Sequence, residues 1–332
     1  MTTTTWQRWT VAFLAAGVLG GAAWGQAVDA ERKAPRKIRI GLVAKSQSNP
    51  VFQAAYAGAK DAARELGPKY NAEIMIDWQT PPDEDAQKQA EAIEQLARAG
   101  AQGIAVSCSD ANTVTPAIDK AVALGSVVVC FDSDAPRSKR LCYYGTDDAT
   151  CGKAVMAELA EIMEGRGSIA ILAGNQTAPN LQKRVQGVKD ELAKHADMKL
   201  VDDGVFYHPE TPEQSAAAVN TAQRTNPQIR GWAMIGGWPL FTKNALKWEP
   251  GSVKVVAVDA LPAQLSYLES GHVQTLFAQD CYGWGYKSVE LLLEKIVNDK
   301  APAEPRVIDP LTKVTKDNAA EFRAKWDKWL GK

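Results

Sequence analysis

The chain has 332 residues, of which 45% are hydrophobic and 23% charged, so it can bury a large core and is long enough for two domains. Its formal net charge of −1 shows no basic excess, which argues against nucleic acid or an anionic membrane as a partner. The composition is that of an ordinary globular protein.

The N-terminus predicts a secretory signal peptide. One cation, Arg8, precedes the apolar run VAFLAAGVLGGAA, and Ala23-Trp24-Gly25 places small residues at the −3 and −1 positions of a cut before Gln26. A membrane anchor would need about 18 to 20 apolar residues. We therefore expect residues 1–25 to be removed, 26–36 to be a linker, and the mature protein to lie in the periplasm.

Beyond the linker, short apolar runs alternate with amphipathic segments. The runs suited to strands are IRIGLV, EIMIDW, GIAVS, VVVCF, LCYYG, SIAILA, KLVDDGVFY, GWAMIG, VKVVAV and VQTLFA. Helical spacing of apolar residues marks 52–66, and it recurs around Ile93, Ile118, Val155, Val185 and Val289. This alternation predicts an α/β fold, and ten strands favour two doubly wound parallel-sheet lobes over one large sheet.

Polar residues directly follow several of these strands. Ligands of doubly wound sheets bind beyond the carboxyl ends of the strands, so these residues are candidates for one shared site. They are Asn49, Ser107, Asp132, Gly174-Asn175-Gln176, Asp259 and Gln279. The opposing interpretation of each is an ordinary loop or helix-cap residue.

The run VVVCF ends at Asp132-Ser133-Asp134, which places two carboxylates and a hydroxyl just past a buried strand. Four roles fit this pattern: a metal ligand, a nucleophile, an acceptor for ligand hydroxyls, or a loop cap. A phosphatase-type nucleophile is disfavoured, because Ala135-Pro136 follows where that motif has Thr or Val and Asp147-Asp148 lies too close to be its distant metal pair.

Other chemical motifs fail on spacing. The stretch from Gly145 to Lys153 has six residues between its glycines where a phosphate loop has four, and Ala154 replaces the Ser or Thr. The three histidines are far apart in sequence and show no paired-ligand spacing. We therefore expect no catalytic residues, no metal and no cofactor.

Five cysteines are an odd number for an exported protein, so at least one thiol has no partner within the chain. They are Cys108, Cys130, Cys142, Cys151 and Cys281, and their spacing fits no zinc pattern. A bridge between Cys142 and Cys151 is left open.

Seven segments occur in a characteristic order: GLVAKSQSNPVFQAAYAGAKDAARELG, GIAVSCSDANTV, VVVCFDSDAP, YYGTDD, NLQKRVQGVKD, VVAVDALP and TLFAQD. Their order and spacing, from about Lys37 to Val314, resemble the periplasmic sugar-binding proteins of ABC importers in the ribose-, galactose- and xylose-binding group. The resemblance implies a type I periplasmic binding protein fold, in which a three-segment hinge joins two lobes and a monosaccharide lies in the cleft between them.

The resemblance also implies domain boundaries, with crossovers between the lobes near Thr146, Gln279 and Asp309. The N-terminal lobe is then 37–146 and 280–308, and the C-terminal lobe is 147–279 and 309–314. The tail, 315–332, is predicted to be a helix, because three aromatic residues fall on one helical face: Phe322, Trp326 and Trp329.

By position, the resemblance assigns ligand-binding roles to residues of both lobes. Asn49 and Phe52 resemble the first polar and aromatic contacts, and Asp132 resembles the carboxylate that accepts from sugar hydroxyls. The second-lobe arginine and the late pair near the hinge correspond to Arg184, Asp259 and Gln279. Sugar hydroxyls donate and accept together, so carboxylates paired with an arginine or an amide satisfy them. Asp134 is expected to cap the following loop.

Several positions depart from the ribose-binding pattern and argue against ribose as the ligand. Ser133 stands where ribose binders have Arg, Ser107 stands where Asn is usual, and Gly237-Trp238 replaces an Asn-Asp pair. Trp238 and Trp284 are candidates to stack on a sugar, with core packing as the alternative role. Tyr207 or His208 is a candidate to line the cleft.

The sequence thus predicts an exported, non-enzymatic solute-binding protein, expected to be a monomer, that has no nucleic-acid partner. It would capture a monosaccharide or related small polyol and deliver it to an ABC permease in the inner membrane. The alternative is a receptor that presents a sugar or furanose-like signal to a membrane sensor or chemoreceptor.

Overall fold

The computed structural model describes Met1 and residues 34–329. The predicted signal peptide, its cleavage site and most of the linker lie outside the described residues. The chain from Pro35 onward forms one compact unit. Within the described part of the chain, no helix is long and apolar enough to cross a membrane.

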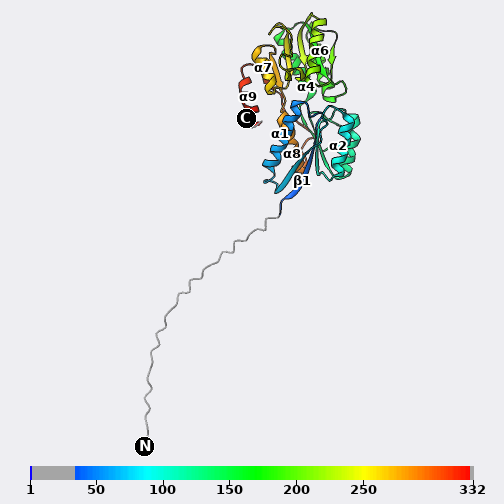
Figure 1. The fold of residues 1–332 in the computed structure, drawn as a ribbon, viewed down its shortest axis with the longest axis vertical. Coiled ribbons are helices and arrows are strands. Elements are labelled where there is room, and N and C mark those ends of the chain that lie inside the picture. The colour runs from blue at the N-terminus through cyan, green and yellow to red at the C-terminus, as the bar shows by residue number, and fades with distance from the viewer. Residues whose placement is uncertain (2–33, 330–332) are drawn as a thin grey trace. The chain divides into compact units, whose positions relative to one another are not determined.

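The first lobe is built on a six-stranded sheet of order β11-β5-β4-β3-β1-β2, in which every pairing is parallel. Its strands are β1 (Arg36–Val43), β2 (Ala72–Trp78), β3 (Gly103–Val106), β4 (Val127–Phe131), β5 (Cys142–Gly145) and β11 (Arg306–Ile308). The core on one face includes α1 (Pro50–Leu66) and α8 (Cys281–Asn298). The core on the other face includes α2 (Ala86–Arg98) and α3 (Ala111–Ala123), as Figure 1 shows.

The second lobe repeats this plan, with strand order β12-β10-β9-β8-β6-β7 and only β12 antiparallel to its neighbour. Its strands are β6 (Arg166–Gly174), β7 (Asp197–Tyr207), β8 (Ile229–Met234), β9 (Lys254–Val258), β10 (Thr275–Ala278) and β12 (Thr312–Val314). One face packs α4 (Asp148–Ile162) and α5 (Pro179–Leu192), and the other packs α6 (Pro212–Thr225), the short helix η1 (Trp238–Phe241) and α7 (Pro262–Ser270).

Two glycines allow α4 and α5 to approach closely. A Cβ atom on Gly152 would lie 2.0 Å from the carbonyl oxygen of Arg184, and one on Gly187 would lie 2.2 Å from that of Ala149. Neither distance leaves room for a side chain, so the sequence fixes α5, and with it Arg184, directly against α4.

The predicted fold class is confirmed, and all ten predicted strands are present. The chain passes between the two sheets after β5, after β10 and between β11 and β12. The tail helix α9 (Ala319–Trp329) begins four residues later than predicted, because Asn318 Oδ1 accepts from the amide of Thr315 and closes a turn before it.

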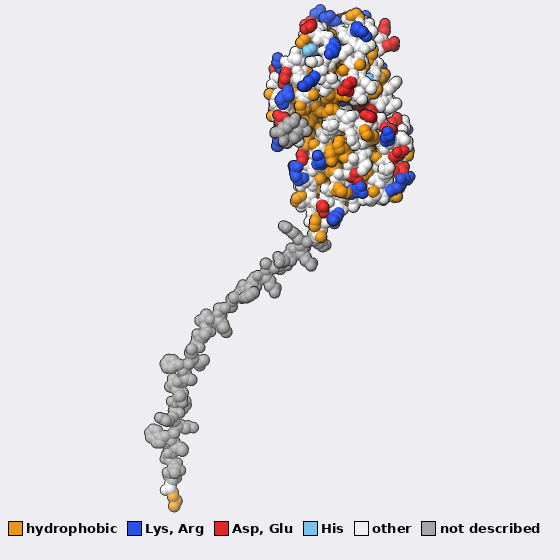
Figure 2. Space-filling model, viewed as in Figure 1, with side chains coloured by type: hydrophobic (Ala, Val, Ile, Leu, Met, Phe, Trp, Pro, Cys, Tyr) orange, Lys and Arg blue, Asp and Glu red, His pale blue; other side chains and the backbone are white. Residues whose placement is uncertain are grey.

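Acidic and basic side chains are intermixed over the face shown in Figure 2. Hydrophobic side chains gather on this face where the two lobes meet. A mostly apolar cavity of about 190 Å³ lies beside α9, and its walls include Ala54 of α1, Leu261 next to α7, and Trp326.

Candidate ligand-binding site between the lobes

Residues of both lobes line one small cavity of about 20 Å³. Seven of the residues predicted for the site border it: Asn49, Phe52, Asp132, Arg184, Trp238, Asp259 and Gln279. A volume of this size holds about one water molecule. The lobes therefore meet closely here, and a larger ligand enters only when they separate.

Asp132 and Asp259 occupy equivalent places in the two lobes. They follow β4 and β9, the third strands of the two sheets, and their amides donate to Tyr144 O at 3.2 Å and Phe277 O at 2.8 Å. Both have left-handed backbones, with φ of 55° and 71°. Such conformations cost about 1 to 2 kcal/mol in residues with a Cβ and are concentrated at functional sites.

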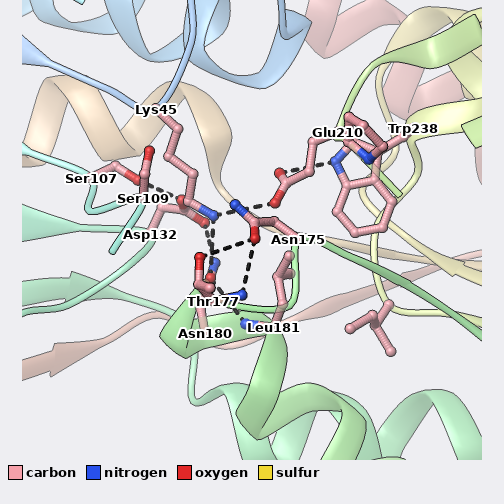
Figure 3. A network of polar contacts seen from close by, with 12 residues as sticks. Lys45, Ser107, Ser109, Asp132, Asn175, Thr177, Asn180, Leu181, Glu210 and Trp238 are labelled. Atoms are coloured by element: carbon pink, nitrogen blue, oxygen red, sulfur yellow. Dashed lines mark hydrogen bonds and ion pairs between the residues drawn. The ribbon is translucent and has the colours of Figure 1, made fainter. Parts of the chain in front are cut away.

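The Asp132 carboxylate is bonded within its own lobe and across the cleft. Ser107 Oγ donates to Oδ2 at 2.6 Å, and Asn180 Nδ2, from the second lobe, donates to Oδ1 at 3.2 Å (Figure 3). Ser107 is fully buried behind Asp132 and does not border the cavity. It therefore orients the carboxylate from behind and leaves Oδ1 facing the other lobe.

Lys45 extends from the end of β1 into the middle of this network. Its Nζ donates to Asn180 Oδ1 at 3.2 Å and lies 3.8 Å from Glu210 Oε1, and Figure 3 shows it between these groups. The side chain is only 3% exposed. Burial lowers the pKa of Lys45, but the negative charges of Glu210, Asp132 and Glu84 outweigh that effect and raise it above its usual range. The cleft therefore holds a buried ammonium ion.

Arg184 is fixed by the second lobe and the adjoining hinge segment. Nε donates to Asp148 Oδ1 at 3.0 Å, Nη1 to Ile235 O at 3.1 Å, and Nη2 to Gln279 Oε1 at 2.7 Å. Gln279 Nε2 in turn donates to Asp259 Oδ1 at 2.8 Å. A guanidinium has five N–H donors. These bonds leave one N–H on each terminal nitrogen for a ligand.

Burial also sets the charge state of the surrounding carboxyls. It raises the pKa of Asp148 to about 6, although the charge of Arg184 opposes the shift. Burial likewise raises the pKa of Asp259, and the Gln279 amide bond opposes it. At both carboxyls the neighbouring donors therefore oppose the effect of burial on the pKa.

Aromatic side chains form the apolar part of the cavity wall. Trp284 of α8 lies 6.2 Å from Phe52 and 6.3 Å from Phe131, measured between ring centroids. Trp238 Nε1 donates to Glu210 Oε2 at 3.2 Å, and its ring contacts His208 edge-on at 5.0 Å. Both tryptophans are packed in the structure and also border the cavity.

Three of the remaining predicted residues lie elsewhere. Ser133 is fully buried, and its carbonyl accepts from the amide of Cys108 at 3.1 Å. Gly237 does not border the cavity, and a Cβ there would be 1.8 Å from Gln264 Nε2. Tyr207 is 44% exposed and borders a second, outer cavity. Asp134 pairs with Arg140, which is consistent with a role in shaping its loop.

Sequence reasoning missed Lys45, Asn180 and Glu210. Lys45 had a usable signal, because a charged residue there follows the buried run IRIGLVA at the end of a strand. Asn180 is the second residue of α5, and Glu210 lies three residues after β7. Neither position differs in sequence from an ordinary helix start or loop.

The cysteines form no bridge. All five lie in the described part of the chain as buried free thiols, so the bridge considered between Cys142 and Cys151 is not formed. The described residues contain no group of three or more His, Cys, Asp or Glu side chains placed to hold a metal ion.

Residues 40–300, most of the chain, match the family of periplasmic binding protein domains. The chain belongs to this family. Its members described below are binding proteins, not enzymes.

Among curated relatives, this periplasmic binding protein is 26% identical to a D-ribose/D-allose-binding protein of Pseudomonas aeruginosa over 260 residues, 74% of this chain and 78% of that one. It is 25% identical to a D-apiose import binding protein of Actinobacillus succinogenes over 193 residues, 58% of this chain and 59% of that one.

Solved structures give the same fold. A solute-binding protein of an ABC transporter from Burkholderia graminis C4D1M, in complex with D-arabinose, is 27% identical, with a TM-score of 0.76 and coverage of 86% of this chain and 98% of that one. A solute-binding protein from Agrobacterium vitis bound to α-D-tagatopyranose also has a TM-score of 0.76 over 87% of this chain and 98% of that one. At 19% identity, the latter likeness bears on the fold alone.

Proposed function

We propose that the protein is an exported solute-binding protein that holds a neutral monosaccharide or related small polyol between its lobes and delivers it to an ABC permease. The observation that carries this proposal is the convergence of Asp132, Lys45 and Asn180 with Arg184 and Asp259 on one cavity with an aromatic wall. This set offers both donors and acceptors, as hydroxyl groups require.

The proposed binding step exchanges contacts between the lobes for contacts with the ligand. When the lobes separate, Asp132 and Lys45 lose their bonds to Asn180 and Glu210. Ligand hydroxyls then donate to Asp132 and accept from Lys45, while Arg184 and Asp259 hold the other side of the ring. The closed form gains ligand contacts that the open form lacks, which is the differential affinity that closure requires.

The similarity to sugar-binding relatives supports the ligand class. The solved relative at 27% identity is in complex with D-arabinose, which is a pentose. The curated relative at 26% identity is a binding protein for D-ribose, a pentose, and D-allose, a hexose. In this chain, Ser133 stays behind the cavity wall and Lys45 enters it, so we expect a preference that differs from that of ribose binders.

The proposal includes the lobes, location and partners predicted from the sequence. We assign 37–146 and 280–308 to one lobe and 147–279 and 309–314 to the other, with the hinge at Thr146, Gln279 and Asp309. We further propose cleavage near Gly25, a monomer in the periplasm, and a permease in the inner membrane as the partner.

The test is a thermal-shift screen of the mature chain over pentoses, hexoses, deoxy sugars and polyols, followed by calorimetry of each hit. A ligand at a hundredfold excess over its Kd stabilises the folded state by about 2.7 kcal/mol, which gives a clear shift. Recovery of the sugar unchanged after incubation separates binding from catalysis. A flat response across the panel would contradict the proposed function.

A further inference from the structure

The mouth of the cleft contains a second and much larger cavity, of about 670 Å³. Two loops of the first lobe and two of the second border it, and Glu210 borders both this outer cavity and the inner one. The lobes already touch at the base of the cleft, where Asn180 lies 3.2 Å from Asp132. The outer cavity therefore belongs to the closed arrangement of the lobes.

Buried polar atoms without a hydrogen-bond partner are concentrated around this cavity. The described residues contain nine such side-chain atoms, and four belong to residues that border it: Glu84 Oε1, His208 Nε2, Glu210 Oε1 and Thr211 Oγ1. The Glu210 side chain is only 8% exposed, and its Oε1 has no hydrogen bond, only the ion pair with Lys45 Nζ at 3.8 Å. Buried polar atoms without a hydrogen bond are costly, so this lining favours a polar ligand over an apolar one.

The lining also limits the charge of such a ligand. Asp83, Glu84 and Glu210 border the cavity, and none of the described residues around it is Lys or Arg. Burial and the charge of Glu210 together raise the pKa of Glu84 to about 7. An acidic group is therefore disfavoured here.

Donors and an aromatic ring complete the lining. Thr211 is the N-cap of α6, but its buried hydroxyl makes no capping bond and has no other hydrogen-bond partner. Tyr207 exposes 44% of its surface at the same cavity. Hydroxyl donors, carboxylate acceptors and an exposed aromatic face together match a sugar ring better than a single small substituent.

We propose that the outer cavity is a subsite for a second, neutral sugar unit, so that the preferred ligand is a disaccharide or a glycoside. This inference rests on the proposed function, because the first unit occupies the inner site between Asp132 and Arg184. The second unit would lie against Tyr207 and exchange hydrogen bonds with Glu84, Glu210 and Thr211.

Calorimetry on the mature chain tests this with matched pairs of probes: xylose and xylobiose, glucose and maltose or cellobiose, galactose and lactose or melibiose. We expect one disaccharide to bind about tenfold or more tightly than its monosaccharide. Tyr207→Ala and Thr211→Val should remove this gain and leave the monosaccharide affinity within about twofold. Leu124→Ala, at an exposed apolar residue outside both cavities, should change neither affinity.

The outcomes separate the two proposals. If monosaccharides bind and no disaccharide binds more tightly, the subsite is overturned and the proposed function stands. Equal losses of both affinities in Tyr207→Ala would also overturn the subsite. If neither class of sugar binds, both proposals fail. A disaccharide that ends in glucuronic acid should bind less tightly than its neutral counterpart, and tighter binding would contradict the anionic lining.

Discussion

Asp132 and Asp259 end equivalent strands of the two lobes with the same backbone conformation, yet their carboxylates have different partners. Asp132 is bonded to Asn180 of the opposite lobe, whereas Asp259 is bonded to Gln279 at the hinge. The cations differ in the same way. Arg184 is held by Asp148 and Ile235 O of its own lobe, whereas Lys45 reaches across to Asn180 and Glu210.

This difference indicates that the second lobe carries the rigid half of the site. Arg184, Asp148 and Asp259 have their partners within this lobe and the hinge, so they are already arranged for a ligand, and of the charged groups of this lobe at the inner site only Glu210 has its partner across the cleft. In the first lobe, Lys45 and Asp132 exchange their contacts across the cleft for contacts with the ligand. Only the bond from Ser107 to Asp132 lies within that lobe and is kept.

The largest effect is expected for Arg184→Ala. It leaves the Asp148 carboxylate, 4% exposed, without its cation and should lower the free energy of unfolding by about 3 to 5 kcal/mol. Lys45→Ala should lower it by only about 1 to 2 kcal/mol, because Glu210 borders the outer cavity and can be hydrated there. Urea unfolding of both variants measures the difference, and equal losses would contradict the contrast.

A second substitution separates stability from binding in the same variant. Arg184→Ala combined with Asp148→Asn removes the buried unpaired charge, so much of the lost stability should return. Ligand affinity should not return, because the guanidinium that borders the cavity, with its two N–H groups left unbonded, is gone. Recovery of both would show that Arg184 acts only through the fold.

Asp132→Ala should mainly affect ligand binding. Loss of the charge-assisted bond and the unpaired hydroxyls in a closed site should cost about 2 to 4 kcal/mol, or roughly 30- to 1000-fold in Kd. Calorimetry with the sugar found in the screen measures this. Asp134→Ala is the matched control, because this neighbouring carboxylate pairs with Arg140 and does not border the cavity. Binding by Asp132→Ala within threefold of the parent would exclude Asp132 from the site.

The sequence predicted the rigid elements well, for a physical reason. A buried parallel strand is a continuous apolar run, and its end is marked by the first polar residue, as at Asp132 and Asp259. The weaker elements lacked this signal. Helix α6 is rich in small and polar residues, α7 spans only nine residues, and β11 and β12 span three each.

The residues that cross the cleft could not be found in the same way. Asn180 and Glu210 reach Lys45 and Asp132 only because one lobe faces the other, and nothing in the local sequence encodes that contact. Conversely, Ser133 and Gly237 lie next to site residues in the sequence but do not border the cavity.

The pH dependence of stability tests the repulsion between the lobes at Glu84. Because burial and Glu210 raise its folded-state pKa from 4.5 to about 7, the folded state keeps a proton that the unfolded state releases. The free energy of unfolding should therefore fall as the pH rises from about 4.5 to 7 and then level off. Glu84→Gln should lessen this fall by about 1 to 3 kcal/mol.

Asp148 contributes a fall of the same sign, since burial raises its pKa to about 6, so the decisive quantity is the difference between parent and variant. Lys45, Asn175 and Ser109 lower the pKa of Glu84 and so oppose its rise. These effects are also lost in Glu84→Gln. Parallel stability curves for the two proteins between pH 4.5 and 8 would contradict a cross-cleft charge effect.

The smallest effect is expected at the hinge, where Trp326 of α9 joins the lobes away from the cleft. Its ring packs in the core cluster of the first lobe, and its Nε1 donates to Ala260 O of the second at 2.8 Å. Trp326→Phe keeps most of the ring and removes this bond, so it should lower the free energy of unfolding by about 1 kcal/mol beyond the loss of ring area.

Trp248→Phe is the matched control, because the buried Nε1 of Trp248 has no hydrogen-bond partner and its removal relieves an unpaired donor. Both changes remove the same atoms, so we expect a larger loss of stability in Trp326→Phe than in Trp248→Phe in urea unfolding. A loss in Trp248→Phe as large as that in Trp326→Phe would show that this bond does not contribute to holding the lobes together.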